Sequence, residues 1–395
     1  MKDIKVVIGA NFGDEGKGLM TDYFADKAKE ANESCVVVLH NGGAQRGHTV
    51  VTPEGYRHVF KHFGSGTYVG AATYIAKEFI VNPAYFRKEY ESLSRHLKMP
   101  EIYINPNCKL TTIYDMLINQ VLEIDRGSGK HGSCGSGIFE TLYRNQNGID
   151  FVNTFEYNPL RMTVGEFNQL SYISKVDFLN FIRKSYVPKR FDIFGLKNIS
   201  VEFTNVLLSD AAIVNFIDDF SFMMNNSSFA NDEVLNRYDS VIFENGQGLL
   251  LDQHNRDYFP HLSPSNTGLS NPTEILNGLD YTGIVEACYV SRTYMTRHGV
   301  GRFDTECHKT EFYDNMVDMT NVPNPFQDHL RYGKLNFMDL NKRVNKDILS
   351  AKGKFIIKEN LAFTHMNEYQ EDFVAKYPMK YHSYSQTRDG VYLKS

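Results

Sequence analysis

No apolar run in this sequence is long enough to cross a membrane. A membrane-spanning helix needs about 20 consecutive apolar residues, whereas the first apolar run begins at Ile4 and gives way to a polar glycine loop after Ala10. A short run of this kind is typical of a buried strand rather than of a secretory signal. We therefore expect a cytoplasmic protein without a membrane partner.

Cysteine is also scarce, and its distribution argues against two further classes of protein. The five cysteines are odd in number, scattered and never arranged as a CxxC pair; they are Cys35, Cys108, Cys134, Cys288 and Cys307. This spacing fits neither a structural zinc site nor a disulfide framework. A reducing compartment fits the pattern best.

The sequence has no excess of basic residues either. Its formal net charge is −5 at pH 7 and it contains no RNA-reading motif, so we expect no nucleic-acid partner. A phosphate-bearing substrate then needs a local basic site. The 395 residues are 42% hydrophobic, and no repeat or convincing linker divides them. We therefore expect residues 1–395 to form one α/β domain with insertions.

The N-terminal residues alternate between strand and helix patterns. Ile4–Ala10 and Cys35–Leu39 are short runs rich in valine and isoleucine, which is typical of strands buried on both faces. Gly16–Ala31, between them, is rich in helix formers. The three segments predict a βαβ unit. The glycine loop after the first strand therefore lies at the carboxyl end of a parallel strand, where open α/β sheets bind ligands.

The rest of the chain is less regular. Val50–Thr52 and Tyr56–Lys61 flank a Pro-Glu-Gly turn and predict a hairpin. The run RGSGKHGSCGSG at Arg126–Gly137 has two interpretations, a flexible linker or an ordered loop around an anion. The other predicted elements are a helix at Thr112–Ile124 and strands at Glu101–Asn105, Ser240–Glu244, Ile284–Val290 and Leu361–Thr364.

The first glycine loop reads NFGDEGKG at residues 11–18. Backbone N–H groups of such a loop bind anions, and Lys17 is placed to reach terminal phosphates. The strict phosphate-loop pattern is not met, because Asn11 occupies the first glycine position and Gly18 replaces the hydroxyl residue that holds Mg²⁺. A metal therefore needs another ligand, which Asp14 can supply, and the same carboxylate can act as a base on a second substrate. The alternative is a strand-to-helix turn with capping acids.

A second glycine loop, LHNGGAQRGHT at residues 39–49, follows the second predicted strand. Gly47 lets the backbone approach a ligand closely, and His48 can donate a proton or a hydrogen bond near neutral pH. A histidine in a turn is more often structural. We nevertheless expect the two loops to lie beside each other, with His48 close to Asp14 and Lys17.

These motifs resemble those of the adenylosuccinate synthetase family. The family writes the first loop as WGDEGKG and the second as GGxNAGHTVV, and it has three further blocks, FEGAQGxxLD, YPYVTSSNT and TRVGxG with PTE. The fold that the resemblance implies is related to P-loop proteins, with a large, mostly parallel central sheet, helices on both faces and small inserted subdomains. The corresponding stretches here are FENGQG and LLD at 243–252, YFPHLSPSNT at 258–267, and TRHGVG with DTE at 296–306.

The resemblance implies a ligase that activates a purine 6-oxo group with a nucleoside triphosphate and then replaces it with the amine of L-aspartate. Asp14 would be the base that removes the N1 proton. Asp14 and the carbonyl of Gly47 would hold Mg²⁺, Lys17 would neutralise the transferring phosphoryl group, and His48 would bond the phosphoryl oxygens and O6. With Gln247, these side chains make up the expected catalytic set. The expected ATP-binding residues are Gly13, Glu15, Gly16, Lys17, Gly18, Gly47, His48, Thr49, Thr364, His365 and Asn367.

The acceptor nucleotide is expected to bind between the two loops. Arg46 stands where the family has alanine, and it has two interpretations, a substrate contact or a surface side chain. A homodimer is implied, with an arginine that crosses to the phosphate in the other subunit; Arg144 and Arg161 are the candidates. The expected nucleotide contacts are Asn11, Asp14, Asn41, Gln45, Arg46, Ser133, Cys134, Gln247 and Ser263.

Two departures from the family bear on the substrates. The family reads guanine with the aspartate of TKLD, and here the same strand end has Asn367, so we expect ATP as donor. The aspartate loop shrinks to FQDHLRYG, in which Gln327, Arg331 and Gly333 are expected to bind L-aspartate, Arg331 through both carboxylate oxygens.

These departures resemble the phage 2-aminoadenylosuccinate synthetases, which act on dGMP. Many members of that branch replace the base aspartate, whereas this chain keeps Asp14. We favour a Mg²⁺-dependent ligase that converts dGMP, L-aspartate and ATP to N6-succinyl-2-amino-2′-deoxyadenylate, ADP and phosphate, in the cytoplasm of the host cell if the chain is phage-encoded. An enzyme acting on IMP with GTP or ATP is the alternative. A non-catalytic nucleotide-binding protein is more remote, because such a protein needs no base.

Overall fold

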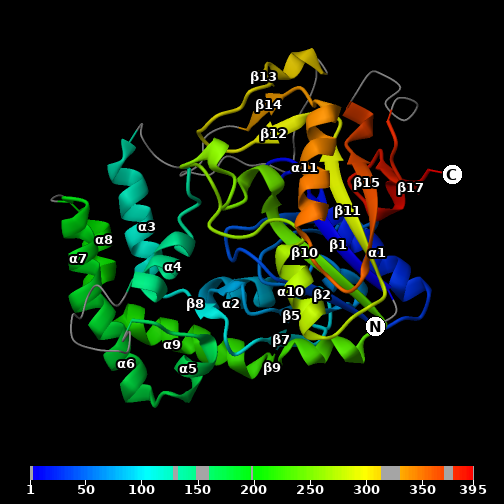
Figure 1. Cartoon of the computed structure of the whole chain (residues 1–395). Helices are drawn as coiled ribbons and strands as arrows, with labels where there is room; N and C mark the ends of the chain where they lie inside the picture. Colours follow the sequence, from blue (N-terminus) through cyan, green and yellow to red (C-terminus); the bar gives the residue numbers. More distant parts are fainter. Residues whose placement is uncertain are drawn as a thin grey trace.

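A ten-stranded sheet forms the centre of the protein (Figure 1). The structure, a computed structural model, describes residues 3–127, 132–147, 160–196, 199–312, 330–368 and 377–394. From one edge to the other, the strands are β17 (Val391–Leu393), β16 (Tyr381–Ser383), β15 (Ile356–Thr364), β11 (Ile284–Arg292), β1 (Asp3–Gly9), β10 (Ser240–Gly248), β2 (Cys35–Leu39), β5 (Ala72–Ile75), β7 (Ile102–Ile104) and β9 (Ser228–Phe229). Neighbouring strands are parallel apart from β16 and β17, which confirms the predicted, mostly parallel sheet.

Helices cover both faces of this sheet, as the continuous apolar strand runs predict. Alternate residues of β1 enter different core clusters, Ile4 on one side and Val7 on the other. The helices that complete these clusters are α1 (Lys17–Glu30) on the side of Val7, and α10 (Ser270–Gly278) and α11 (Phe337–Ser350) on the side of Ile4.

The predicted βαβ unit is present, but its two strands are not neighbours. Strand β10 lies between β1 and β2 and pairs in parallel with both. The expectation that the two glycine loops end adjacent strands is therefore wrong in this detail. The connection through α1 passes over one strand position in the sheet. Strand β10, from more than 200 residues later in the chain, occupies that position. As a result, β10 brings its own residues to the space between the loops.

Local sequence signals fix the starts of several helices. Helix α3 (Ile113–Asp125) begins with a capping box, in which the Thr112 hydroxyl accepts from the backbone N–H of Asp115 and the Asp115 carboxylate accepts from the N–H of Thr112. Helix α2 (Pro83–Leu93) begins with proline after the capping side chain of Asn82.

The helices α3 to α9 gather to one side of the sheet in Figure 1, as a helical insertion. They are α3, α4 (Ile138–Asn147), α5 (Val164–Gln169), α6 (Tyr172–Phe181), α7 (Val187–Ile193), α8 (Val201–Leu208) and α9 (Asp210–Asn225). Smaller sheets are made by β3 (His48–Val51) with β4 (Arg57–Phe60), by β6 (Ile80–Val81) with β8 (Lys109–Leu110), and by β12 (Met295–Arg297), β14 (Arg331–Gly333) and β13 (Glu306–Cys307).

The remaining predicted elements are confirmed within one to several residues. The hairpin is β3 and β4, the predicted helix is α3, and the four later strands are β7, β10, β11 and β15. The part of the Arg126–Gly137 run that the structure describes is bonded to α3, since the N–H groups of Gly132 and Ser133 donate to Glu123 Oε2. Among the described residues, no helix has the length and apolar character to cross a bilayer.

Candidate functional site

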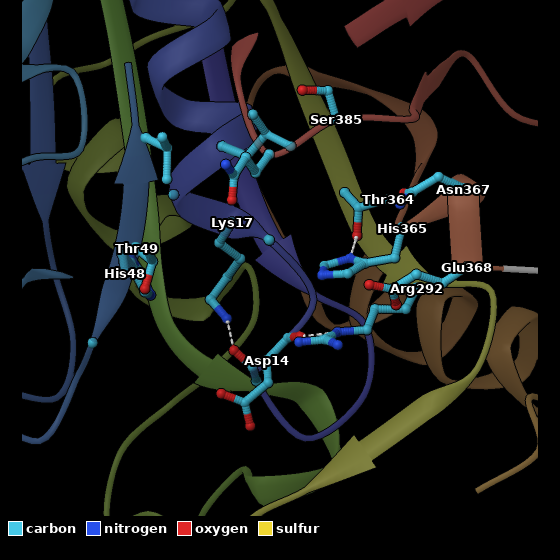
Figure 2. A pocket seen from close by; sticks show the side chains of 17 residues that line it. Asp14, Lys17, His48, Thr49, Arg292, Thr364, His365, Asn367, Glu368 and Ser385 are labelled. Carbon is cyan, nitrogen blue, oxygen red and sulfur yellow. Dashed lines mark hydrogen bonds between the residues drawn. The ribbon is translucent and has the colours of Figure 1, made fainter. Parts of the chain in front are cut away.

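A cavity of about 250 Å³ opens at the carboxyl ends of the central strands (Figure 2). Three stretches of sequence supply most of its walls, and Arg292, Ser385 and Gln386 line it from elsewhere in the chain. The first glycine loop contributes 13–19 apart from Glu15, the second contributes 47–49, and the end of β15 contributes Thr364, His365, Asn367 and Glu368. The structure thus brings together the two predicted loops and the predicted nucleotide-reading segment.

Within the first loop, the acidic side chains face opposite ways. Glu15 is 2% exposed, and its Oε1 accepts from the backbone N–H groups of Asn11 at 3.0 Å and Gly13 at 2.8 Å. Burial raises the pKa of this carboxyl group. Glu15 therefore shapes the loop from inside, and it is absent from the cavity wall where a phosphate contact was predicted.

Lys17 lines the cavity and is held by the same loop. Its Nζ donates to the Gly13 carbonyl at 2.6 Å and lies 3.6 Å from Glu15 Oε2. Gly16, directly before α1, has φ of 93°, in the region that favours glycine, and a side chain there would meet Thr364 at 3.1 Å. The end of β15 thus packs against the first glycine loop, and the Thr364 hydroxyl donates to the Glu15 carbonyl at 2.7 Å.

Asp14 reaches the cavity with a side chain that is 25% exposed. Its Oδ2 lies 3.7 Å from His298 Nε2, and its backbone carbonyl accepts from Arg292 Nε at 2.6 Å. His298 stands where the family motif has valine. Figure 2 shows the Asp14 carboxylate and the Lys17 ammonium on the same side of the loop.

The residues predicted for Mg²⁺ fit that ion. The Asp14 carboxylate and the backbone of Gly47 line one cavity. Mg²⁺ takes oxygen ligands and usually binds one or two carboxylates together with water and substrate phosphates. No cluster of three or more histidine, cysteine or acidic side chains suited to a metal occurs among the described residues. A metal here would therefore depend on the phosphate groups for its remaining ligands.

His48, at the start of β3, belongs to a buried polar cluster. Its Nδ1 lies 2.6 Å from Glu244 Oε1 and 2.7 Å from Arg46 Nη2, while Arg46 Nη2 lies 2.7 Å from Glu244 Oε2. The backbone N–H of Ser65 donates to Oε2 at 3.1 Å, and its hydroxyl donates to Oε1. Burial alone would raise the pKa of Glu244, but Arg46 and His48 hold it well below its usual range. A carboxylate only accepts hydrogen bonds and a guanidinium only donates them, so Glu244 favours a proton on Nδ1 of His48 whereas Arg46 favours a lone pair there.

The electrostatics of His48 follow from that cluster. Burial, with Arg46 adding to it, lowers the pKa of His48 to about 4. At neutral pH the ring is therefore uncharged. An anionic phosphoryl group next to it would favour a proton on Nε2, which could then donate a hydrogen bond.

Arg46 is not a surface residue, contrary to the second interpretation above. It is 1% exposed, and its Nε and Nη1 have no hydrogen-bond partner among the described residues. Its side chain contacts His48 and Glu244, and it does not itself line the cavity. Sequence proximity could not show this, because Glu244 comes from β10.

Sequence reasoning missed two charged residues of the site, Glu244 and Arg292. Glu244 is the last residue of the predicted strand Ser240–Glu244, and Arg292 lies two residues beyond the predicted strand Ile284–Val290. A charged residue at or near the end of a core strand was the available signal. Arg292 lines the cavity and donates through Nη1 to the Tyr294 hydroxyl at 2.8 Å. The Tyr294 hydroxyl in turn donates to Glu368, which also lines the cavity.

The predicted acceptor-nucleotide residues fall into two groups. Asn41 and Asn11 brace the protein: Asn41 exchanges hydrogen bonds with the backbone of Gly246 at 2.7 and 3.0 Å, and Asn11 Nδ2 donates to Ser291 Oγ at 2.9 Å. Gln45 differs, because both polar atoms of its amide are buried without a hydrogen-bond partner.

Gln247 and Ser263 lie near the end of β10. Gln247 has φ of 64°, an uncommon conformation for a residue with a side chain. Its backbone packs against the first loop, since a Cβ on Gly13 would lie 3.0 Å from its Cα. Ser263 Oγ lies 3.4 Å from Ser265 Oγ.

The loop with Ser133 and Cys134 leads into α4, which packs against the second glycine loop. Ser133 Oγ donates to Asn119 Oδ1 at 2.9 Å, and Cys134 Sγ lies 3.1 Å from Ser136 Oγ. The contact of α4 with the second glycine loop is tight, because a Cβ on Gly43 would lie 2.7 Å from the Ile138 side chain.

The structure excludes Arg144 as the arginine that reaches another subunit. Its guanidinium is fully buried, and its Nε and Nη2 each donate to an oxygen of Asp115 at 2.9 Å. Other donors go to the carbonyls of Leu160 and Leu110. Arg161 is exposed and stays the candidate.

The predicted L-aspartate residues are only partly described. Gln327 lies outside the described residues. Arg331 is engaged by Glu306, with Nε 2.8 Å from Oε1 and Nη2 bonded to Oε2, and its Nη1 donates to the carbonyls of Gly299 and Gly301 at 3.1 and 2.8 Å. Gly333 pairs with Glu306 in the small sheet. An incoming carboxylate would therefore compete with Glu306 for Arg331.

The fold and the cavity define the class of protein. It is an α/β protein whose central, mostly parallel sheet carries a glycine loop of the type that binds anions. The family model of adenylosuccinate synthetase matches residues 6–322, so the chain belongs to the adenylosuccinate synthetase family.

Relatives with that name are moderately similar in sequence. The adenylosuccinate synthetase of Mesoplasma florum is 28% identical over 304 residues, which cover 76% of this chain and 64% of the relative. That of Synechococcus elongatus is 28% identical over 310 residues, covering 77% and 63%. The match thus spans a little less than two-thirds of the length of these relatives.

Two solved structures share the fold. A fully ligated adenylosuccinate synthetase from Plasmodium falciparum superimposes with a TM-score of 0.67 at 16% identity and covers all of both chains. The succinoaminodeoxyadenylate synthetase of cyanophage S-2L, bound to dGMP and dATP, gives a TM-score of 0.63 at 14% identity and covers 100% of this chain and 95% of the other.

Proposed function

We propose that this protein is a ligase that joins L-aspartate to C6 of dGMP at the expense of ATP. The products are N6-succinyl-2-amino-2′-deoxyadenylate, ADP and phosphate. The observation that carries the proposal is that Asp14, Lys17 and His48, from two separate glycine loops, line one cavity. A nucleotide-binding protein without catalysis has no use for a carboxylate inside a phosphate loop.

The arrangement supports a two-step reaction. Asp14 would accept the N1 proton of the purine while O6 attacks the terminal phosphoryl group, and Lys17 would neutralise the charge that develops there. Mg²⁺, held by Asp14 and the Gly47 carbonyl, would supply charge stabilisation to the phosphate oxygens when bound. In the second step the aspartate amine attacks C6, the C6–O bond breaks and phosphate leaves.

His48 would act on the same oxygen atoms. The negative charge of the phosphoryl group would favour the ring tautomer with its proton on Nε2, which would donate a hydrogen bond to that group. Glu244 and Arg46 would hold the ring in place from behind, through Nδ1. Gln247, which completes the proposed catalytic set, would lie at the junction of β10 and the first loop.

The identity of Asn367 supports ATP as the donor. An amide presents both a donor and an acceptor and can pair with adenine, whereas the family's aspartate selects the two N–H groups of guanine. Asn367, Thr364 and His365 line the cavity from the end of β15.

The choice of acceptor has two candidates. The cyanophage neighbour bound to dGMP and dATP supports dGMP. The names of the sequence relatives, together with the retained Asp14, favour IMP as the second candidate. His298, 3.7 Å from Asp14, alters the surroundings of the base relative to the family pattern, and this change supports a modified purine pocket.

The proposal extends to assembly and location. Residues 1–395 would form one domain, and two copies would make a homodimer. Arg161 would be the residue that crosses to the phosphate bound by the other subunit. The protein would work in the cytoplasm, with small-molecule substrates and without nucleic-acid or membrane partners.

A direct assay tests the function. The full-length protein is incubated with Mg²⁺, ATP and L-aspartate, with dGMP or IMP as acceptor, and both phosphate release and the succinylated product are followed by mass. Product from dGMP supports the proposal, product from IMP alone replaces it with the second candidate, and nucleotide binding without phosphate release contradicts catalysis.

A further inference from the structure

Lys61 follows strand β4 and reaches the back of the second glycine loop. Its Nζ donates to the carbonyl of Ala44 at 2.9 Å and to that of Arg46 at 3.2 Å. The ring of Tyr85 lies beneath it, with the ammonium 5.4 Å from the ring centroid. These contacts fix the position of a partly buried positive charge.

That charge has no anionic partner in the described part of the chain. The hydrogen-bond acceptors of Nζ are both neutral carbonyls, and they use two of its three N–H donors. The nearby Glu89 carboxylate accepts instead from the backbone N–H groups of Lys61 and His62. A buried cation is costly unless an anion pairs with it. The third N–H donor of Lys61 is therefore available to an anion that is not part of the chain.

The surroundings indicate what kind of anion fits. Burial lowers the pKa of Lys61, and the largest opposing electrostatic effect comes from Cys134. Burial also raises the pKa of Tyr85, and Cys134 again adds to it. The 132–137 loop leads into α4, whose Ile138 side chain would lie 2.7 Å from a Cβ on Gly43, the residue before Ala44 in the second glycine loop. The loop carries hydroxyl groups and three glycines with positive φ, Gly132 at 79°, Gly135 at 74° and Gly137 at 79°.

A second unsatisfied group lies in the same glycine loop. The amide of Gln45 is buried, and neither its nitrogen nor its oxygen has a hydrogen-bond partner. Its neighbours in sequence, Ala44 and Arg46, are the residues whose carbonyls hold Lys61. A cation, an orphaned amide and a hydroxyl-bearing loop together match a phosphate group, which offers negative charge and several acceptor oxygens.

We propose that Lys61 supplies, from within one chain, the cation that pairs with the phosphate of the acceptor nucleotide at the 132–137 loop. This inference rests on the proposed function, which requires a nucleoside monophosphate as acceptor. In this inference Lys61 supplies the positive charge that Arg144 cannot provide, because the Arg144 guanidinium is hydrogen-bonded to the Asp115 carboxylate.

The test compares nucleotide and nucleoside binding. The full-length protein and its variants are titrated calorimetrically with dGMP, with IMP, with deoxyguanosine and with ATP. Lys61→Met removes the charge at similar length, Lys61→Gln keeps an N–H donor without charge, and Lys61→Arg keeps the charge. Lys109→Met is the matched control, because Lys109 is a partly buried lysine that already has an anionic neighbour, Glu78, at 3.6 Å.

Loss of a charge-assisted hydrogen bond should weaken binding of the preferred monophosphate roughly 10- to 100-fold in Lys61→Met and Lys61→Gln. Binding of deoxyguanosine and of ATP should stay within about twofold, and Lys61→Arg should restore most of the monophosphate affinity. Thermal unfolding without ligand shows whether each variant is folded.

The outcomes separate this inference from the proposed function. If the unmodified protein binds neither monophosphate, the proposed function fails. If it binds one of them and folded Lys61→Gln binds it equally well, Lys61 does not contact the phosphate. If Lys61→Met loses nucleoside and nucleotide affinity alike, the role of Lys61 is structural and the inference is wrong.

Discussion

Arg46 and Glu244 form a fully buried ion pair, with 2.7 Å between Arg46 Nη2 and Glu244 Oε2. It joins the second glycine loop to strand β10, which comes from a distant part of the sequence. His48 and Ser65 complete the set of hydrogen bonds around the carboxylate. The position of the candidate catalytic imidazole therefore depends on a strand that neither glycine loop contains.

Glu244→Gln should lower the free energy of unfolding by about 3–5 kcal/mol, because it leaves the Arg46 charge buried without a counter-charge. Urea-induced unfolding measures this value. The double variant Arg46→Met with Glu244→Gln should be less destabilised than the sum of the single variants, since it removes both charges together. Strict additivity would contradict a coupled pair.

Asp14→Asn should lower the rate of phosphate release at least roughly 100-fold, because an amide cannot accept the N1 proton. ATP affinity should change far less, since Lys17 and the backbone of the loop still face the phosphates. Single-turnover assays with saturating substrates measure the rate. Asp257→Asn, at an exposed position, is the control, and near-normal turnover in Asp14→Asn would remove Asp14 from its role as base.

Asn367→Asp should shift donor preference toward GTP. A carboxylate accepts from the two N–H groups on the guanine edge, whereas an amide pairs with adenine. We expect the ratio of kcat/KM for GTP to that for ATP to rise about tenfold or more, within the 1.5–3 kcal/mol typical of charge-assisted hydrogen bonds. An unchanged ratio in an active variant would show that this segment does not read the donor base.

Arg331 and Glu306 should affect L-aspartate in opposite directions. Arg331→Met should raise the KM for L-aspartate roughly 10- to 100-fold, because it removes a bidentate partner of the carboxylate. Glu306→Gln should lower that KM by up to about fivefold, since a partly exposed ion pair contributes at most about 1 kcal/mol. Steady-state kinetics with ATP and acceptor saturating measure both. A KM that rises in Glu306→Gln would mean that Glu306 positions Arg331 for substrate instead of competing for it.

His62→Gln should weaken the dependence of stability on pH. Burial lowers the pKa of His62 to about 3 in the folded protein, so between that pH and about 6.5 the unfolded chain binds a proton that the folded protein does not. The unmodified protein therefore loses stability from this group as pH falls through that window. Relative to it, His62→Gln should gain about 2 kcal/mol between pH 6.5 and pH 5.

Urea unfolding at pH 7.5, 6.5 and 5 measures this difference. His96→Gln, which removes an exposed histidine, controls for the loss of an imidazole as such. Equal slopes for His62→Gln and the unmodified protein would contradict the assignment.

Local patterns in the sequence were sufficient for several strands of the central sheet and for helices α1 and α3. The buried stretches of β1, β2, β10 and β11, and the last four residues of β15, appear in the sequence as short apolar runs. Helix α3 carries its capping signals in adjacent residues. The strand order was not accessible in this way, because insertion of β10 between β1 and β2 is a relationship between residues about 200 positions apart.

In the candidate site, too, some features were predicted from local sequence patterns, whereas the contacts between distant residues were not. Asp14, Lys17 and His48 were predicted because each stands within a glycine loop at a strand end, and the structure places all three on one cavity. The contacts of Arg46, Arg144 and Arg331 were not predicted. Each of these arginines pairs with a carboxylate at a different place in the chain, and the sequence alone cannot show which pairs meet.

The sequence by itself determined the chemistry that is available: two glycine loops, an acid, a lysine, an imidazole and an amide in the donor segment. Only the tertiary structure decided which charges are free to meet a ligand. It closed Arg46 and Arg144 into buried ion pairs and left Lys61 without an anion. The physical reason is that charge pairing acts over a few ångströms in space, and the packing of the sheet and its insertion sets those distances.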